Sequence, residues 1–305
     1  MKKLFTLLAL TITFSMNAQM SDNSSGTSAT GSYAVAMGNS TTASGTTSTA
    51  MGSGSTASGG FSTAMGQNTT ASGDFSTAMG QNTTASGNFS TAMGQSTTAS
   101  GDFSTAMGKE TTASEGFSTA MGRETTASGK YSIAMGRNTT ASDYASLVIG
   151  RYNSSGSSVT NDSISFSTSN TAFVIGNGTK LENKSDAFKV MFNGDTTVSN
   201  DLTVSGDVVI SSDARLKTNI VSLGSTLSKL LQIDGKSYEM KGKQKIGVLA
   251  QEIKEVFPEL VSEDDNEMLA VNYQGLVPVL INALKEQQSE IDELKEMIQL
   301  LVSKE

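Results

Sequence analysis

Cysteine, histidine and tryptophan are absent from the 305-residue chain, and proline occurs only twice. Without cysteine and histidine, the chain can build no zinc site of the Cys/His type, no thiol nucleophile and no Ser-His-Asp triad. Disulfides cannot stabilise the fold, so repetition or oligomerisation has to do so. Any proteolytic chemistry must use serine, threonine, lysine or a carboxylate. We expect neither a metal nor a cofactor.

Aromatic residues and positive charge are also scarce. Aromatics make up 6% of the chain, and the formal net charge is −8. Nucleic-acid binding needs lysine and arginine to displace counterions from phosphates, so we expect no nucleic-acid partner. Few bulky side chains among abundant glycine, serine and threonine argue against one large globular core.

Residues 1–19 have the three-part pattern of a secretory signal peptide. Lys2 and Lys3 precede an apolar stretch, and small or polar residues follow it up to about Ala18. The stretch is too short for a spanning helix, and nothing later approaches the ~20 apolar residues of one. A buried helix is the alternative. We expect a secreted or cell-surface protein without a transmembrane anchor of its own, and a linker over 20–28.

A repeat of 14 residues occupies the next part of the chain. Methionine recurs at that spacing from Met37 to Met135, and Ile149 takes the same place. The unit "TASGDFSTAMGQNT" (70–83) divides into two similar halves of seven residues. A fixed period indicates a solenoid, and a glycine in each half favours turns between short strands rather than helix.

Alternation along a strand would place Phe75 and Met79 on one face, and Ser76 and Ala78 on the other. Stacked coils would then align identical residues in columns. Because most of these residues are small, one chain buries little bulky surface. Several chains packed together are the easier solution.

The run "STAMG" (76–80) and its equivalents over 29–150 resemble the head repeats of trimeric autotransporter adhesins. The resemblance implies a left-handed parallel β-roll with three chains side by side. Three alternatives to an adhesin-like roll exist. Disorder conflicts with the strict period, whereas ice or polysaccharide binding by paired threonines such as 69–70 stays open. A calcium roll is rejected because Asp74 and Asp102 are replaced by Gly60 and Asn88 in other units.

Residues 151–210 lose the period but still alternate apolar and polar residues. Asn-Gly and Ser-Gly pairs at 177–178, 193–194 and 205–206 predict strands joined by hairpin-like turns. We expect a β-rich connector, interlaced in the oligomer, with Val204, Val208 and Ile210 leading into Ser211.

From residue 211 the composition shifts toward lysine, glutamate, leucine and isoleucine. The run at 245–260 predicts a strand and then a helix that stops near Pro258, with Ile253 and Phe257 at helical spacing. The run at 268–305 predicts a short strand and a long helix. Its apolar seam predicts a coiled coil over 276–305 and consists of Leu280, Leu284, Gln287, Ile291, Leu294, Ile298 and Leu301.

Isoleucine and leucine in this order favour a dimer in simple coiled coils. A dimer conflicts with a trimeric roll. We give the roll precedence because the seam is short and Gln287 sets register as much as stoichiometry.

The segments "SDARLKTNI" (212–220), "IGVLAQEI" (246–253) and "VNYQGLVPVLINALKEQQ" (271–288) resemble the C-terminal intramolecular chaperone of phage endosialidase tail spikes. In that family the domain trimerises, guides folding of the preceding fibre and cuts itself off with a Ser-Lys dyad. The resemblance implies Ser212 as the nucleophile and Lys217 as the base.

Ser212 and Lys217 also suit a nucleophile and a base by their chemistry alone. A serine needs a base, and lysine is the amine available in a chain without histidine. Desolvation or a neighbouring cation such as Arg215 would favour the neutral amine. Five residues apart on a strand or a helix, Ser212 and Lys217 would not meet. The chain must therefore turn between them, or the lysine must come from another subunit. The alternative is a helical turn capped by Ser212 or Asp213.

The bond to be cut flanks Ser212. Attack on the carbonyl of Ser211 forms a five-membered ring, which favours the 211–212 bond. The bond between Ser212 and Asp213 stays open if another subunit supplies the nucleophile.

We predict a mainly β protein with an α C-terminal part. A trimeric left-handed parallel β-roll of 14-residue coils (29–150) is followed by the β-rich connector (151–210) and an α+β chaperone domain (211–305). The predicted function is a secreted homotrimeric, adhesin-like fibre that binds an unidentified surface ligand or glycan and cleaves itself once. The alternatives are a multi-turnover serine protease and an uncleaved binding protein with a permanent trimerisation domain.

Overall fold

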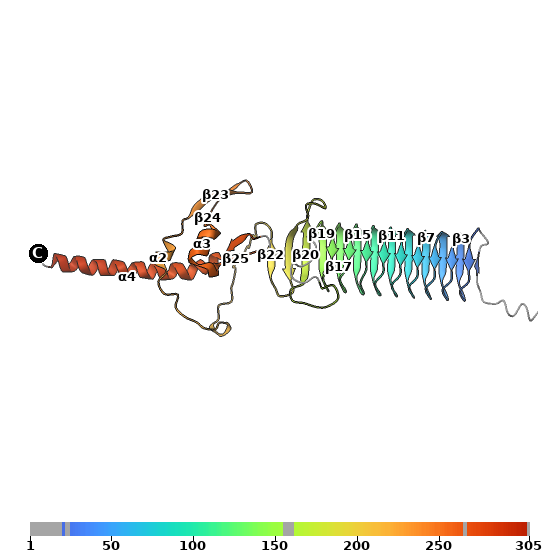
Figure 1. Cartoon of the computed structure of the whole chain (residues 1–305), viewed down its shortest axis with the longest axis horizontal. Coiled ribbons are helices and arrows are strands. Elements are labelled where there is room, and N and C mark those ends of the chain that lie inside the picture. The colour runs from blue at the N-terminus through green and yellow to red at the C-terminus, as the bar shows by residue number, and fades with distance from the viewer. Residues whose placement is uncertain (1–19, 22–24, 155–161, 265–266, 304–305) are drawn as a thin grey trace, which may run out of the picture. The chain divides into compact units, whose positions relative to one another are not determined.

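A computed structural model describes residues 20–21, 25–154, 162–264 and 267–303 (Figure 1). The predicted signal peptide, 1–19, lies outside these residues. The chain divides into two compact units, residues 1–205 and 206–305.

The first unit is a parallel β-solenoid of 14-residue coils, as predicted. Each coil contributes a five-residue strand to one sheet and a two-residue strand to a second sheet. The first sheet runs in the order β1 (Met20–Ser21), β3 (Val35–Asn39), β5 (Thr49–Ser53), β7 (Thr63–Gln67), β9 (Thr77–Gln81), β11 (Thr91–Gln95), β13 (Thr105–Lys109), β15 (Thr119–Arg123), β17 (Ile133–Arg137) and β19 (Leu147–Arg151). The second sheet holds β2 (Ser28–Ala29), β4 (Thr42–Ala43), β6 (Thr56–Ala57), β8 (Thr70–Ala71), β10 (Thr84–Ala85), β12 (Thr98–Ala99), β14 (Thr112–Ala113), β16 (Thr126–Ala127) and β18 (Thr140–Ala141).

Residues 14 positions apart are register partners. Thr91 pairs with Thr105, Ala92 with Ala106, and so on along the parallel strands. Strand pairing begins ahead of residue 29, because Met20 of β1 pairs with Val35 of β3. The predicted linker therefore contains the first strand of the sheet.

The interior of the roll is made of alanine and small hydroxyl side chains. Ala78 and Ala92 are fully buried, as are their equivalents in the neighbouring coils, and Ser76 and Thr83 are buried beside them. Thr77 and Met79 are only half-buried, which confirms the predicted alternation of faces. From Ala34 to Ala141 the buried side chains are alanine, serine and threonine alone, so each coil is narrow.

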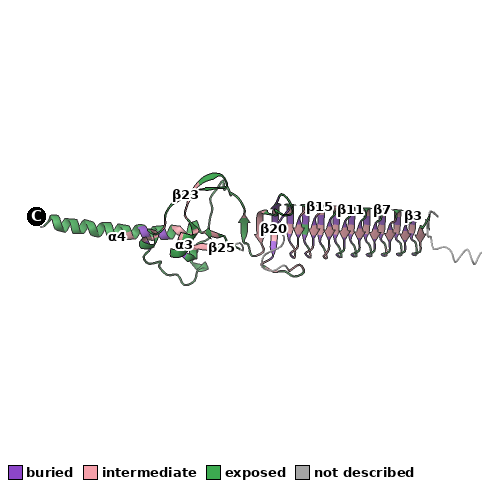
Figure 2. Cartoon of the chain, turned by 45° about the horizontal axis from the view of Figure 1, so that its top comes forward, coloured by how far each residue is buried: buried purple, intermediate pink, exposed green. Residues whose placement is uncertain are grey.

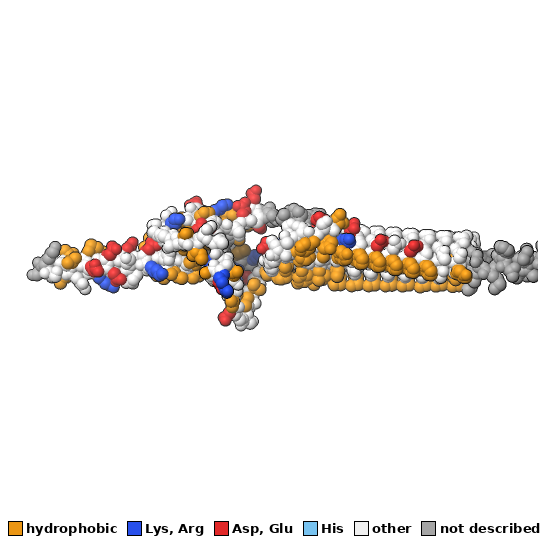
Figure 3. Space-filling model, turned by 90° about the horizontal axis from the view of Figure 1, so that it is seen from below, with side chains coloured by type: hydrophobic (Ala, Val, Ile, Leu, Met, Phe, Trp, Pro, Cys, Tyr) orange, Lys and Arg blue, Asp and Glu red, His pale blue; other side chains and the backbone are white. Residues whose placement is uncertain are grey.

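Aromatic side chains form a ladder along the outside of the roll. Phe75 stands at a turn with a φ of 57°. Its ring stacks on that of Phe89 with a centroid separation of 4.8 Å and 2° between the planes. The ladder consists of Phe61, Phe75, Phe89, Phe103, Phe117 and Tyr131. These rings are about half exposed, and Figure 3 shows hydrophobic side chains in rows along the roll.

Beyond β19 the sheet continues with three longer or antiparallel strands. They are β20 (Thr171–Asn177), β21 (Asp186–Met191) and β22 (Thr196–Val198). β20 pairs in parallel with β19, whereas β21 pairs antiparallel with β20 and β22. The turn at Asn193–Gly194 joins β21 to β22, which confirms the hairpin predicted there.

The expected strand through Val204, Val208 and Ile210 is absent. No described residue from 199 to 213 belongs to a strand, and every residue from 201 to 225 is exposed. A strand needs a hydrogen-bonding partner. The alternating pattern over 202–210 has none in this single chain, and its apolar side chains stay in solvent.

The second unit contains three short 3-10 helices, three α-helices and two hairpins within its described residues. In chain order these are η1 (Ala214–Leu216), α2 (Leu227–Leu230), β23 (Lys236–Met240), β24 (Lys243–Gly247), α3 (Ala250–Val256), η2 (Pro258–Leu260), β25 (Val261–Glu263), β26 (Leu269–Val271), η3 (Tyr273–Gly275) and α4 (Leu276–Val302). The strand and helix predicted over 245–260 and the long C-terminal helix are confirmed.

A small core holds this unit together. Ile253 and Phe257 of the α3 region pack with Val279 of α4, and all three are buried. Most of α4 is exposed, as Figure 2 shows, and the predicted seam residues Leu284, Ile291 and Ile298 lie in solvent. No helix in the described part of the chain is long and apolar enough to cross a membrane.

Candidate self-processing site

Ser212 and Lys217 meet within one chain. The Nζ atom of Lys217 lies 2.8 Å from the Oγ atom of Ser212, which is hydrogen-bond distance. The contact brings together the two side chains that the sequence pointed to as nucleophile and base. Of the two geometries that the spacing left open, the structure contains the turn within a chain.

The turn is the 3-10 helix η1, and Asp213 caps it. Asp213 is extended, with φ −63° and ψ 133°, and its carboxylate accepts a hydrogen bond from the backbone N–H of Arg215. The backbone N–H groups of Leu216 and Lys217 then donate to the carbonyls of Asp213 and Ala214, both at 3.1 Å. One tight turn therefore reverses the chain between Ser212 and Lys217. Capping and the Ser-Lys contact coexist, because different side chains provide them.

Arg215, which the sequence offered as a cation that could act on Lys217, pairs with Asp213 in the structure. Its Nε and Nη2 atoms donate to both carboxylate oxygens of Asp213, at 2.7 to 3.1 Å. The Arg215 guanidinium lowers the pKa of the Asp213 carboxyl, and Asp213 raises the pKa of Arg215. This ion pair offsets the positive charge of Arg215. Sequence spacing gave no sign that Arg215 would turn back toward Asp213.

The site is open to solvent on a single chain. Ser212, Asp213 and Lys217 are all exposed. Apolar side chains flank them, and Val209, Leu216 and Val221 are 88%, 72% and 83% exposed. A lysine that acts as a base must be neutral, which burial favours and water opposes. The single chain thus holds the Ser212 hydroxyl and the Lys217 amine in contact but does not exclude water from them.

A second polar cluster, which the sequence did not reveal, anchors the segment that follows the site. Glu286 of α4 accepts hydrogen bonds from the backbone N–H groups of Thr226 and Leu227 and from the hydroxyl of Ser225. These donors hold the pKa of Glu286 below its ordinary value. The start of α2 is thereby fixed to α4, 60 residues later in the chain.

Residues 212–262 match the family model described as chaperone of endosialidase. The matched segment begins at Ser212 and includes Lys217. A second model, the YadA head domain repeat, matches residues 29–55 and then, in overlapping copies, residues 57–153. The chain is thus similar to adhesin head repeats over 29–153 and to a chaperone of endosialidase over 212–262. The run at 271–288 lies beyond the matched segment, and no curated protein matches the chain.

Proposed function

We propose that the chain forms a homotrimeric fibre, secreted or attached to a cell surface, whose second unit directs assembly and then cuts the chain beside Ser212. The contact of 2.8 Å between Lys217 Nζ and Ser212 Oγ carries this proposal. This contact lies at the start of the segment that is similar to the chaperone of endosialidase. The leader-like pattern of residues 1–19 supports export.

The chemistry of the cut follows from the contact. Lys217 Nζ accepts the hydroxyl proton while Ser212 Oγ attacks the carbonyl carbon of Ser211. The C–N bond between residues 211 and 212 breaks, and the resulting ammonium returns the proton to the departing amine. The acyl group of Ser211 is then an ester on Ser212, and water hydrolyses it to a carboxylate and a free hydroxyl. If another subunit supplies the nucleophile, the bond between Ser212 and Asp213 is cut instead.

Assembly would provide the missing exclusion of water. Every residue from 201 to 225 is exposed on one chain, including the apolar ones. Burying these side chains between copies removes apolar surface from water and desolvates the lysine at the same time. Cleavage then takes place once, after the trimer has formed. A turn that belongs to its own substrate is ill suited to multiple turnover.

Intact masses of four versions of the full chain test this function: wild type, Ser212→Ala, Lys217→Arg and the control Ser211→Ala. Arginine keeps the positive charge of lysine but does not deprotonate. We expect two fragments from the wild type and the control, with the larger one trimeric under non-denaturing conditions. We expect uncut chains from the other two. Four uncut chains would refute self-cleavage, and a monomeric wild type would refute the role in assembly.

Two outcomes would favour the other functions. Cutting of a separate peptide covering 205–220 would indicate a multi-turnover protease. An uncut trimer that shapes ice crystals or binds neutral glycans would favour the threonine columns, in which Thr84 and Thr98 stand in register on neighbouring coils.

A further inference from the structure

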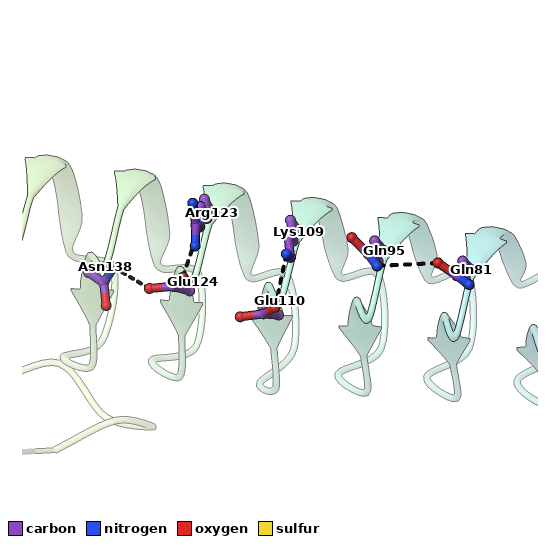
Figure 4. A network of polar contacts seen from close by, with 7 residues as sticks. All are labelled: Gln81, Gln95, Lys109, Glu110, Arg123, Glu124 and Asn138. Carbon is purple, nitrogen blue, oxygen red and sulfur yellow. Dashed lines mark hydrogen bonds and ion pairs between the residues drawn. The ribbon is translucent and has the colours of Figure 1, made fainter.

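A row of long polar side chains runs along the first sheet, at the last residue of each strand from β7 to β19, and Figure 4 shows part of it. In three successive coils this residue is glutamine, and the amides bond to one another. Gln81 Nε2 donates to Gln67 Oε1 at 3.0 Å, and Gln95 Nε2 donates to Gln81 Oε1 at 3.2 Å. In the next four strands the same position is basic, and the register partners are Lys109, Arg123, Arg137 and Arg151.

The basic row works against the stability of the roll. Register partners on neighbouring strands are about 4.8 Å apart, and like charges placed opposite one another repel. Glutamine avoids this repulsion at the same register, as Gln81 and Gln95 demonstrate. Glutamine at these positions would form stabilising amide hydrogen bonds, and the sequence has basic residues there instead. Positions where a sequence departs from the more stable choice are where a functional site is expected.

The two halves of the basic row differ in their counter-charges. Lys109 pairs with Glu110 at 3.5 Å, and Arg123 pairs with Glu124 at 2.8 Å. One and two coils further on, the residues equivalent to these glutamates are Asn138 and Tyr152. Among the described residues, no carboxylate lies within ion-pair distance of Arg137 or Arg151, and the Glu124 carboxylate, already paired with Arg123, interacts with Arg137 from further away.

The guanidinium groups of Arg137 and Arg151 both lie against the ring of Tyr152. They lie 5.6 Å (Arg137) and 5.7 Å (Arg151) from the ring centroid of Tyr152, which is itself 7% exposed. Arg151 Nη2 also donates to the carbonyl of Thr179 at 3.2 Å. Both arginines are exposed. The protein therefore presents two adjacent, oriented cations to solvent on a buried tyrosine.

We propose that Arg137 and Arg151 bind an acidic polysaccharide, with carboxylates on neighbouring sugars each held by one guanidinium. The forked donors of arginine match a carboxylate. A linear polyuronate carries one carboxylate on every sugar, and this row carries one cation on every coil. A nucleic-acid strand, with a charge every ~3.4 Å, needs many more cations than this acidic chain offers. The inference rests on the proposed function, for which it names the ligand class of the head.

The test measures binding of polygalacturonate oligomers to the full chain by calorimetry, with dextran as a neutral polymer. The variant is Arg137→Gln/Arg151→Gln, because glutamine is tolerated at this register. The matched control is Lys180→Gln/Lys184→Gln, which removes two exposed cations from the same unit. We expect the arginine variant to lose about tenfold or more in affinity and the control to lose little. Binding should weaken as salt screens the charges.

Several outcomes of this test would overturn the proposed polysaccharide site. Equal binding of dextran, equal loss in the lysine control, or arginine-dependent binding of duplex DNA would overturn the proposal. So would absence of binding by a wild-type protein whose mass shows a cleaved trimer. If the arginine variant falls apart into monomers, the arginines belong to a contact between copies, which also overturns it. Polygalacturonate binding by an uncut or monomeric chain would refute the proposed function and leave this inference standing.

Discussion

The carboxylate of Asp213 shapes the turn on which the Ser212–Lys217 contact depends. It caps η1 through the Arg215 N–H and also pairs with the Arg215 guanidinium. The cap bends the chain, and the bend brings Lys217 to Ser212. We expect Asp213→Ala to slow self-cleavage about fivefold to tenfold, because loss of an N-cap costs about 1 kcal/mol.

Arg215→Ala separates the two roles of Asp213. This variant removes the ion pair and leaves the capping bond in place, so it should cleave nearly as fast as the wild type. Time courses of fragment formation measure both variants, and a native mass checks that each one assembles. If both variants form fragments equally slowly, the role of the cap is contradicted and the Asp213–Arg215 ion pair accounts for the slower cleavage.

At this scale the sequence pointed to Ser212 and Lys217 but did not show how the two side chains meet. Ser212 and Lys217 were indicated by resemblance to a chaperone family. The spacing showed only that a turn was needed. Which turn forms depends on the Asp213 carboxylate choosing the Arg215 N–H, and such local competition between hydrogen bonds is not visible in spacing. The same choice places the Arg215 guanidinium against Asp213, which the spacing did not indicate.

At the scale of the element, the glycines within the strands allow the coils to stack closely. Gly94 has a φ of 126°, and a Cβ atom built on it would overlap the carbonyl oxygen of Gly108 in the next coil. Gly94→Ala should destabilise the roll by about 3 kcal/mol. The matched control is Gly116→Ala, because a Cβ there meets nothing closer than the carbonyl oxygen of Asp102 at 3.7 Å. Denaturant midpoints followed by the β-sheet signal compare the two, and equal shifts would contradict the stacking argument.

The bond between α2 and α4 should make the second unit sensitive to acid. The Thr226 backbone N–H and then the Ser225 hydroxyl lower the pKa of Glu286. A group whose pKa is lower when folded stabilises the fold above its unfolded pKa, and this stabilisation is lost as pH falls through the folded pKa. Between neutral pH and about pH 3, the wild type should therefore lose more thermal stability than Glu286→Gln does.

The control for this prediction is Glu290→Gln, which alters an exposed carboxylate one turn along α4. Thermal unfolding followed by the helical signal should show the wild-type acid response in that variant. An identical response in Glu286→Gln would mean that Glu286 does not carry it.

How well each element could be predicted depends on where its hydrogen-bonding partners are. The coils of the roll pair with their own neighbours, so the 14-residue period was enough to locate them. Residues 202–210 have an equally clear alternation and form no strand, since the chain supplies no partner for them. Glu286 was not identified because its donors lie 60 residues away in the sequence.

At the scale of the whole molecule, the exposed seam of α4 makes a prediction about assembly. Leu284, Ile291 and Ile298 are 64%, 40% and 59% exposed on one chain, at the spacing of a heptad core. Ile291→Asp would place a carboxylate from every subunit in that core, where burying unpaired charge is costly. We expect trimer formation to weaken at least about a hundredfold. Because the proposed cleavage needs the assembled site, the variant should also remain uncut.

The control Ser289→Asp adds the same charge at the position of the heptad that points away from the seam. It should assemble and cleave as the wild type does. Native mass spectrometry reports the stoichiometry, and denaturing mass spectrometry of the same sample reports the cut. A monomeric Ile291→Asp chain that still cleaves itself would show that Ser212 and Lys217 react without burial between subunits. Cleavage would then no longer depend on assembly, although the coiled coil would remain the source of the trimer.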